Sequence, residues 1–314
     1  MIRVENLEKY YGDFQALKGI DFEINDGEIV GFLGANGAGK STTLKIMTGF
    51  LAPSAGNVFM DGLNIQDNSL DIRKEIGYLP EMNPLYSEMR VYDYLEFTSQ
   101  VRQMDPADFL RALDRVVAQC DLGAVIHLPI SSCSKGYKQR IGLAAAILHD
   151  PKVLILDEPV SGLDPNQIVE IRNLIRDLGK EKMVIMSSHI LQEIEATVDR
   201  IVIIDHGDIV ANGTSQELMA GFKGRTQLTL DVKYANEDSL SALTGTVSEI
   251  EVSATESVDD RHVLSIEYAR ESDPREAIFD YAKNSGWAIL EMSQSQVHLE
   301  DVFRGLTGEG GADE

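Results

Sequence analysis

The chain has 314 residues, and its 51 Asp and Glu outnumber its 28 Lys and Arg, which gives a net charge of −23. So acidic a chain lacks the broad basic face that nucleic acid requires, and an anionic membrane surface would repel it. The length suits one large domain and a smaller one, and no window of about 18 apolar residues predicts a membrane span, so we expect neither nucleic-acid binding nor direct membrane insertion.

The first predicted elements are strands. Apolar and polar side chains alternate over residues 2–7 and 19–24, as they do in half-buried strands, and residues 25–27 form a turn. The apolar run at 29–33 predicts a fully buried strand. Tyr11, in the connection between the first two strands, either stacks on a purine ring or simply packs on the sheet surface.

A glycine-rich turn follows the buried strand and predicts a phosphate-binding loop. Glycines allow backbone conformations that a Cβ would forbid, so successive amide N–H groups can point into one concavity, and the following helix adds its free N–H groups. Lys40 can then reach the β- and γ-phosphates of a nucleotide, and the Ser41 hydroxyl can hold Mg²⁺. The alternative is a glycine-rich turn that binds nothing. The residues of the loop are Gly34, Ala35, Asn36, Gly37, Ala38, Gly39, Lys40, Ser41 and Thr42.

Two short strands and a long helical region come next. Residues 57–60 and 76–79 predict the strands. Residues 91–149 carry apolar side chains at helical spacing, which we assign to the core.

Within this region, residues 134–136 open a strong helix. Ser134 is a natural N-cap, and Lys135 and Gly136 add charge and backbone access at the helix start. The pattern indicates either a capped helix and nothing more or a second phosphate-binding end. A second end would serve a different face of a nucleotide from the loop before Lys40.

Polar residues follow two later strands at their carboxyl ends, where ligands bind in a parallel α/β sheet. Asp157 and Glu158 come after the buried strand at 153–156. Asp157 could hold Mg²⁺ and Glu158 could act as a general base on water, although such a pair alone is usually only solvated. His189 follows the buried strand at 183–187 and is a sensible hydrogen-bonding partner for a γ-phosphate, although a lone His is more often structural.

The chain then completes the first domain and begins a second one. A turn and helix at 161–178 and a hairpin over 201–211 close the large sheet. After residue 224 the pattern is that of a small α+β domain, whose acidic surface is either a solvated face or an interaction surface. Its predicted strands lie at 226–232, 263–269, 287–292 and 296–299, and its predicted helix lies at 274–285.

Taken in order, these motifs resemble those of the ATP-binding subunits of ABC transporters, over residues 2 to about 220. The segments that match are Walker A at 34–41, Walker B at 153–157, the catalytic glutamate Glu158, the D-loop at 161–164 and the switch histidine His189. Five motifs in the family's order make the resemblance specific.

The resemblance implies an α/β fold, the P-loop NTPase ABC cassette, with a RecA-like core, an antiparallel β subdomain and a helical subdomain. We expect the cassette at 1–222 with its helical subdomain at about 88–150, the small C-terminal α+β domain at 223–308 and a disordered acidic tail at 309–314. The implied ligands are ATP and Mg²⁺. The implied site consists of Lys40, Glu158 and His189 for catalysis, Ser41, Glu81 and Asp157 for the metal, and, beside the loop, Tyr11, Ser134, Lys135, Gly136 and Asp164 for the nucleotide.

The segments at 76–86 and 134–140 are most similar to the ABC-2 type branch of the family, and within it to gliding-motility-type ATP-binding proteins. The sequence departs from the wider family in two places, at Glu81 and in the signature. Glu81 stands where most members have a glutamine that contacts Mg²⁺ and the attacking water, so it adds negative charge beside the γ-phosphate. The signature, usually Leu-Ser-Gly-Gly-Gln, reads Cys-Ser-Lys-Gly-Tyr at 133–137.

The resemblance implies the energy-supplying subunit of an exporter. Since the chain has one phosphate loop and one signature, a working unit needs a second cassette, most simply in a homodimer. A multi-span ABC-2 type permease would be the other partner and would hold the subunit at the cytoplasmic, inner face of the plasma membrane. The alternatives are a soluble ABC ATPase of DNA repair or translation, and a P-loop GTPase, for which the guanine-reading Asn-Lys-x-Asp motif is missing from the sequence.

Overall fold

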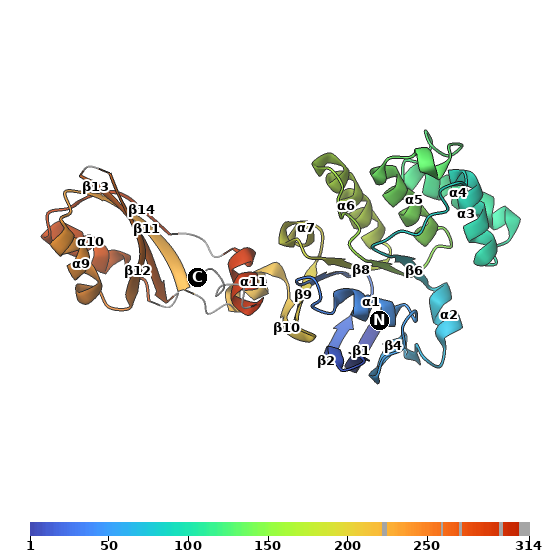
Figure 1. Ribbon diagram of the computed structural model, residues 1–314, viewed down its shortest axis with the longest axis horizontal. Helices are drawn as coiled ribbons and strands as arrows, with labels where there is room; N and C mark the ends of the chain where they lie inside the picture. Colours follow the sequence, from blue (N-terminus) through green and yellow to red (C-terminus); the bar gives the residue numbers. More distant parts are fainter. Residues whose placement is uncertain (222–224, 259, 270–271, 295–297, 308–314) are drawn as a thin grey trace. The chain divides into compact units, whose positions relative to one another are not determined.

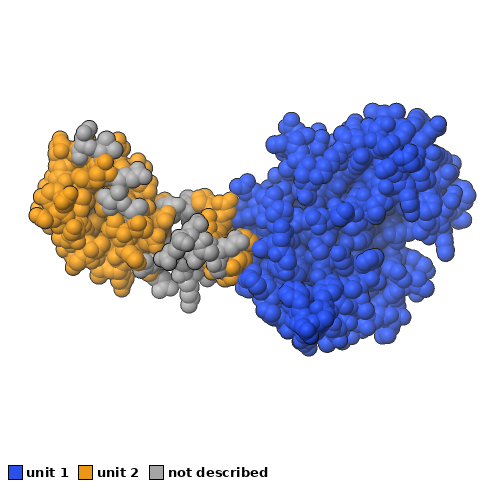
Figure 2. All heavy atoms as spheres, in the orientation of Figure 1, with its two compact units in different colours: residues 1–215 blue, residues 216–314 orange. Residues whose placement is uncertain are grey.

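The computed structural model describes residues 1–221, 225–258, 260–269, 272–294 and 298–307. They belong to two compact units, which span 1–215 and 216–314 (Figure 2). The expected domain limit at residue 222 and the acidic tail expected at 309–314 lie outside the described residues.

A six-stranded sheet forms the centre of the first unit (Figure 1). Five of the six strands, β9, β3, β8, β7 and β6, pair in parallel with their neighbours. The sixth strand, β10, pairs antiparallel with β9 at the edge of the sheet. The parallel strands are almost wholly apolar because both faces of the sheet are covered. In sheet order the strands are β10 (Asp208–Gly213), β9 (Arg200–Asp205), β3 (Ile29–Leu33), β8 (Met183–Ser188), β7 (Val153–Leu156) and β6 (Ile76–Leu79).

A smaller antiparallel sheet packs against one side of this core. Its strands are β2 (Phe14–Ile24), β1 (Ile2–Tyr11), β4 (Ala55–Met60) and β5 (Leu63–Asn64), in that order. Side chains of both sheets share one hydrophobic cluster with helix α1 (Lys40–Met47), and the rings of Phe22 and Phe32 meet edge to face with centroids 5.1 Å apart.

The first two strands are longer than the sequence predicted. The sequence predicted strands at 2–7 and 19–24, but the two strands stay paired as far as Tyr11 and Phe14. The turn between them contains Gly12, which has φ +59°. The segment expected to connect the strands is therefore itself part of the sheet.

Three helices occupy the region that showed one long helical pattern. They are α3 (Val91–Val101), α4 (Pro106–Gln119) and α5 (Lys135–Ile147), with a 3₁₀ turn at Ile130–Ser132. Pro106 begins α4 and Pro129 directly precedes the 3₁₀ turn, because proline favours the first turn of a helix and disfavours its interior. Figure 1 shows the three helices together, with α5 beside the edge strand β6.

The remaining helices of the first unit connect the strands. They are α2 (Ser69–Lys74), α6 (Pro165–Gly179) and α7 (Leu191–Glu195). Helix α8 (Ser215–Gly221) follows β10 and lies almost wholly in the second unit. Within the described ranges, none of the helices combines the length and apolar character that crossing a bilayer needs.

The second unit is a β-α-β-β-α-β arrangement with two helices on one face of an antiparallel sheet (Figure 1). Leucine and isoleucine side chains of strands and helices form its core together with Trp287. The strands, in sheet order, are β12 (Ile250–Val258), β13 (Arg261–Ala269), β11 (Arg225–Lys233) and β14 (Ala288–Gln294), and the helices are α9 (Glu237–Thr246) and α10 (Arg275–Asn284).

One predicted strand of this unit is wrong. Residues 296 and 297 lie outside the described residues, and Leu299 begins helix α11 (Leu299–Thr307) instead of ending a strand. The amide of His298 donates to the Asp301 carboxylate, 2.9 Å away, and this hydrogen bond closes the first turn of the helix.

Candidate functional site

A cavity of about 600 Å³ contains most of the residues that the sequence singled out. Its lining comes from the loop before α1, from the segments that follow β6, β7 and β8, and from the β1–β2 hairpin. The predicted residues that line it are Tyr11, Asn36, Gly37, Gly39, Lys40, Ser41, Thr42, Glu81, Glu158 and His189. The lining also includes Phe14, Ala16 and Ser161, which were not predicted as site residues.

The loop before α1 needs glycine at two of its positions. A Cβ on Gly34 would clash with the carbonyl oxygen of Ile204, and Gly39 has φ +115°, where other residues are strained. Gly39 caps α1 without any side-chain acceptor, so the first amides of the helix remain available to an anion at the cavity. Ala38 is buried in the core cluster, where it anchors the loop.

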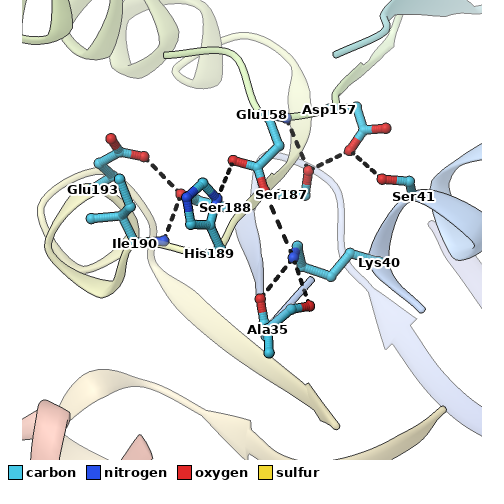
Figure 3. Close-up of polar contacts among 11 residues, drawn as sticks. Ala35, Lys40, Ser41, Asp157, Glu158, Ser187, Ser188, His189, Ile190 and Glu193 are labelled. Carbon is cyan, nitrogen blue, oxygen red and sulfur yellow. Dashed lines mark hydrogen bonds and ion pairs between the residues drawn. The ribbon is translucent and has the colours of Figure 1, made fainter. Parts of the chain in front are cut away.

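Lys40 is almost fully buried and is held by oxygen atoms of the same loop. Its Nζ atom donates to the carbonyls of Gly34 and Ala35, at 2.7 and 3.2 Å, and lies 3.7 Å from Oε1 of Glu158 (Figure 3). Burial lowers the pKa of Lys40, and the charges of Glu158 and Asp157 act against that shift. The ammonium group is thus placed beside the cavity before any ligand arrives.

Asp157 connects the loop helix with strand β8. Its Oδ1 atom accepts hydrogen bonds from the hydroxyls of Ser41, at 3.0 Å, and Ser187, at 2.7 Å (Figure 3). A hydroxyl and a carboxylate side by side suit Mg²⁺, which prefers oxygen ligands and commonly takes one or two carboxylates together with substrate phosphates. In the part of the chain that the structure describes, no group of three or more His, Cys, Asp or Glu side chains could hold a metal by itself.

Tyr78 has a buried hydroxyl for which the described residues provide no hydrogen-bond partner. Burial and the charges of Asp157 and Glu81 raise the pKa of Tyr78 to about 12. A buried polar atom without a partner is rare in folded proteins, and a bound ion or water is one common explanation. The donor set and this hydroxyl together fit a hydrated Mg²⁺ ion.

Glu158 is buried between two side chains that fix its carboxylate. Oε1 is the oxygen near Lys40, and Oε2 lies 3.0 Å from Nδ1 of His189 (Figure 3). The Glu158 amide donates to the Ser187 hydroxyl at 3.0 Å, and the residue has φ +49°, in the left-handed region. The carboxylate is therefore held at the cavity by contacts to its side chain and to its backbone.

The segment that carries His189 is fixed from behind by a buried pair. The Ser188 hydroxyl donates to Oε2 of Glu193, at 2.7 Å, and accepts from the Ile190 amide, at 3.0 Å (Figure 3). Burial raises the pKa of Glu193, with the charge of Glu158 adding to the shift. This support for the histidine was not predicted from the sequence.

Tyr11 lies at the mouth of the cavity with about half of its surface exposed, at 47%. Its hydroxyl is 3.5 Å from that of Thr42, and the Lys9 ammonium is 5.4 Å from the ring centroid. Stacking on a purine remains a prediction for this ring.

The remaining predicted residues form a second group, outside the lining of the cavity. Ser134 caps α5 by accepting from the Tyr137 amide, at 3.3 Å, and Nζ of Lys135 occupies the space that a Cβ on Gly162 would need. The group also contains Gly136, which faces Gln167, and Asp164, which caps α6 by accepting from the Gln167 amide at 3.0 Å.

Comparison with known proteins identifies what the chain resembles. A family model described as ABC transporter matches residues 17–161. The uncharacterized ABC transporter ATP-binding protein YxlF of Bacillus subtilis (strain 168) is 38% identical over 69% of this chain and 72% of its own length. The linearmycin resistance ATP-binding protein LnrL of the same organism is 32% identical over 98% of each chain. The bacitracin transport ATP-binding protein BcrA of Enterococcus faecalis is 32% identical over 99% of this chain and 97% of its own.

A solved structure agrees with these similarities. The ATP-binding subunit of an ABC transporter superposes with a TM-score of 0.64 at 29% identity, over 70% of this chain and 92% of that one. The fold class expected from the motifs, an ABC cassette of the P-loop NTPase type, is confirmed.

Proposed function

This chain belongs to the ATP-binding proteins of ABC transporters, and we propose that it powers a membrane exporter of the ABC-2 type through ATP-driven dimerisation. Proteins of this family bind and hydrolyse ATP, dimerise and work with transmembrane permeases. The chain is accordingly an ABC-type ATPase. One observation supports the finer proposal: the residues that we predict to contact a nucleotide form two separate groups, one around Lys40 and one at the start of α5.

We assign the first group to the phosphates of ATP. Lys40 would exchange its two loop carbonyls for the β- and γ-phosphate oxygens, while the amides at the start of α1 contact the same charges. Ser41 and Asp157 would hold Mg²⁺, together with Glu81, which lines the same cavity. When bound, Mg²⁺ neutralises charge on the phosphate oxygens.

Glu158 and His189 carry the hydrolytic step in this proposal. Glu158 would accept the proton of the attacking water, and His189, which contacts the Glu158 carboxylate and lines the same cavity, would contact the γ-phosphate. The Glu158 carboxylate is buried away from bulk water, so its contacts with Lys40 and His189 control its orientation.

The second group serves the nucleotide of a second cassette. Ser134, Lys135 and Gly136 present a helix start that is separate from the cavity around Lys40 of their own chain. Each group is incomplete alone, and one triphosphate can complete both, so ATP joins two chains and hydrolysis separates them. We propose a homodimer as the working pair.

The substitution Glu158→Gln tests the dimer. This variant should bind ATP, hydrolyse it about 10²- to 10⁴-fold more slowly, and run at twice the 34.6 kDa chain mass in size-exclusion chromatography with Mg²⁺ and ATP. Glu158→Gln combined with Lys40→Ala is the matched control and should remain a monomer. A monomer of Glu158→Gln at saturating ATP would overturn the proposed clamp.

A multi-span permease is the partner that we propose, and it would hold this subunit at the cytoplasmic face of the plasma membrane. Segments 76–86 and 134–140 support the ABC-2 branch, and their likeness to gliding-motility-type ATP-binding proteins is a similarity of sequence. Co-purification with a multi-span membrane protein in detergent tests this partner. The relatives are named as transporter or resistance subunits, so the alternative in DNA repair or translation gains no support from them.

The cargo that we propose is an antimicrobial compound. The relatives that align with nearly the whole chain are named for linearmycin resistance and bacitracin transport. Their alignments continue beyond residue 222, which supports the proposal that an accessory domain at 223–308 is part of this kind of subunit. Expression with its permease in a sensitive bacterium should raise the inhibitory concentration of such a compound, and Glu158→Gln should abolish the increase.

A further inference from the structure

Gln139 links the helix that starts at Ser134 to the segment that follows Glu158. It lies on α5, one turn after Lys135, and its Nε2 atom donates to the carbonyl oxygen of Pro159 at 2.7 Å. Pro159 is the residue directly after Glu158.

The backbone at Glu158 needs restraint from both sides. Glu158 has φ +49°, a conformation that is costly for a residue with a Cβ and persists only where its surroundings enforce it. On the amino side the Ser187 hydroxyl accepts from the Glu158 amide. On the carboxyl side a turn hydrogen bond runs from the Ser161 amide to the Glu158 carbonyl, at 3.2 Å.

Proline makes the contact of Gln139 effective at this position. Pro159 has no N–H, so its own backbone donates nothing to the neighbouring chain. A hydrogen bond to its carbonyl restrains the peptide between Pro159 and Val160, and because the ring fixes φ of Pro159, that restraint reaches the peptide that joins it to Glu158. The Gln139 side chain supplies that hydrogen bond from the α5 side.

We propose that Gln139 is a positioning residue for Glu158: by holding the Pro159 carbonyl, it keeps the Glu158 carboxylate aimed at the attacking water. The inference rests on the proposed role of Glu158 as the general base. A second contact joins the same two segments, because Lys135, also on α5, lies against Gly162. The start of α5 therefore restrains the segment that carries the Glu158 carboxylate of the same chain.

The test compares Gln139→Met, which keeps the length of the side chain and removes the donor, with the full-length wild type. We expect kcat for ATP hydrolysis to fall about tenfold, the effect of losing one hydrogen bond of ordinary net strength, while KM and the affinity for ATP stay within about twofold. Gln119→Met is the control, since Gln119 is an exposed residue on α4, and its kcat should not change. An unchanged kcat in folded Gln139→Met overturns the inference.

A double-mutant cycle separates positioning from a general structural role. In the Glu158→Gln background, Gln139→Met should cause no further loss in single-turnover rate, because the group that it positions is already gone. An equal loss in both backgrounds would contradict the inference. Full hydrolysis by Glu158→Gln itself would instead overturn the proposed base, so the two failures differ.

Gln139→Glu provides a second readout, and carries the test if Gln139→Met does not fold. An ionised carboxylate cannot donate to the Pro159 carbonyl, but a protonated one can. The rate of Gln139→Glu relative to wild type should therefore rise as the pH falls below about 6, toward the range where glutamate takes up a proton. A ratio that is constant with pH would count against the hydrogen bond.

Discussion

The Ser187 hydroxyl donates a 2.7 Å hydrogen bond to Oδ1 of Asp157, and both residues are buried at the carboxyl ends of neighbouring strands. The same hydroxyl accepts from the Glu158 amide at 3.0 Å. One small side chain therefore orients the carboxylate that we propose for the metal and the backbone of the residue that we propose as base.

We predict that Ser187→Ala slows ATP hydrolysis and raises its Mg²⁺ requirement. The change leaves a buried amide and a carboxylate oxygen without this partner, which costs about 1–3 kcal/mol. Hydrolysis rates should fall about tenfold or more and should need more Mg²⁺ to reach half of their maximum, as measured by phosphate release over a Mg²⁺ titration. Ser99→Ala, at a buried serine of α3 that donates to the Glu96 carbonyl, is the control and should leave the Mg²⁺ requirement unchanged. Equal shifts in both variants would contradict the assignment.

Lys40→Ala should reduce the affinity for ATP by about 10- to 100-fold, the usual strength of a charge-assisted hydrogen bond. The wild-type ammonium already lies beside the cavity, so binding replaces its carbonyl contacts instead of ordering a free side chain. Isothermal titration with Mg·ATP measures the difference. Lys45→Ala, in the last turn of α1, should bind as the wild type does. Tight binding by Lys40→Ala would remove the lysine from the proposed phosphate contacts.

The predicted elements that the structure confirms are those with an unambiguous local pattern. β3, β6 and β7 are short, continuous apolar runs, and Pro165 marks the start of α6. Helix α9 was missed because its sequence is polar at most positions, although the hydrogen bonds of Asn236 and Ser239 form a capping box at its start. Strand β12 was missed for a similar reason, since its apolar alternation is brief.

The site shows the same division between local and non-local signals. Gly34 to Thr42 are contiguous, so their chemistry could be predicted from spacing alone. The role of Ser187 depends on β8 lying beside β7. In the sequence, this role was indicated only by a polar residue at the end of a buried strand. The contact of Gln139 with Pro159 joins segments 20 residues apart that no local pattern relates.

Glu81→Gln should reduce the dependence of ATP binding on Mg²⁺. The Glu81 carboxylate lines the cavity, where it repels a metal-free triphosphate and attracts the cation. Removing that charge should tighten binding in EDTA and weaken the gain from Mg²⁺, each by about fivefold for roughly 1 kcal/mol of screened interaction. Binding titrations with and without Mg²⁺ measure both. Glu75→Gln, whose carboxylate pairs with Lys152, is the control and should leave both affinities as they are. Unchanged affinities in Glu81→Gln would show that the charge at 81 does not act on the nucleotide.

His149→Gln should make the first unit less sensitive to acid. Burial, together with the charge of Arg102, lowers the pKa of His149 to about 4, although its Nε2 atom lies 3.1 Å from the Ile76 carbonyl. In the unfolded chain a histidine has a pKa near 6.5, so between these values the unfolded state binds more protons and the free energy of unfolding falls as the pH falls. The shift corresponds to a loss of at most about 3 kcal/mol between pH 6.5 and 4, complete near the lower value.

Urea unfolding at pH 7 and at pH 4.5, followed by a probe of the first unit, measures that loss. Carboxylates elsewhere in the chain also titrate in this range, so the quantity to compare is the difference between wild type and His149→Gln at each pH. That difference should shift in favour of the variant at the lower pH, because glutamine has no proton to take up in the unfolded state. His127→Gln, at an exposed histidine, is the matched control and should follow the wild type. Parallel losses in wild type and His149→Gln would mean that the buried imidazole is protonated as readily in the folded chain as in the unfolded one.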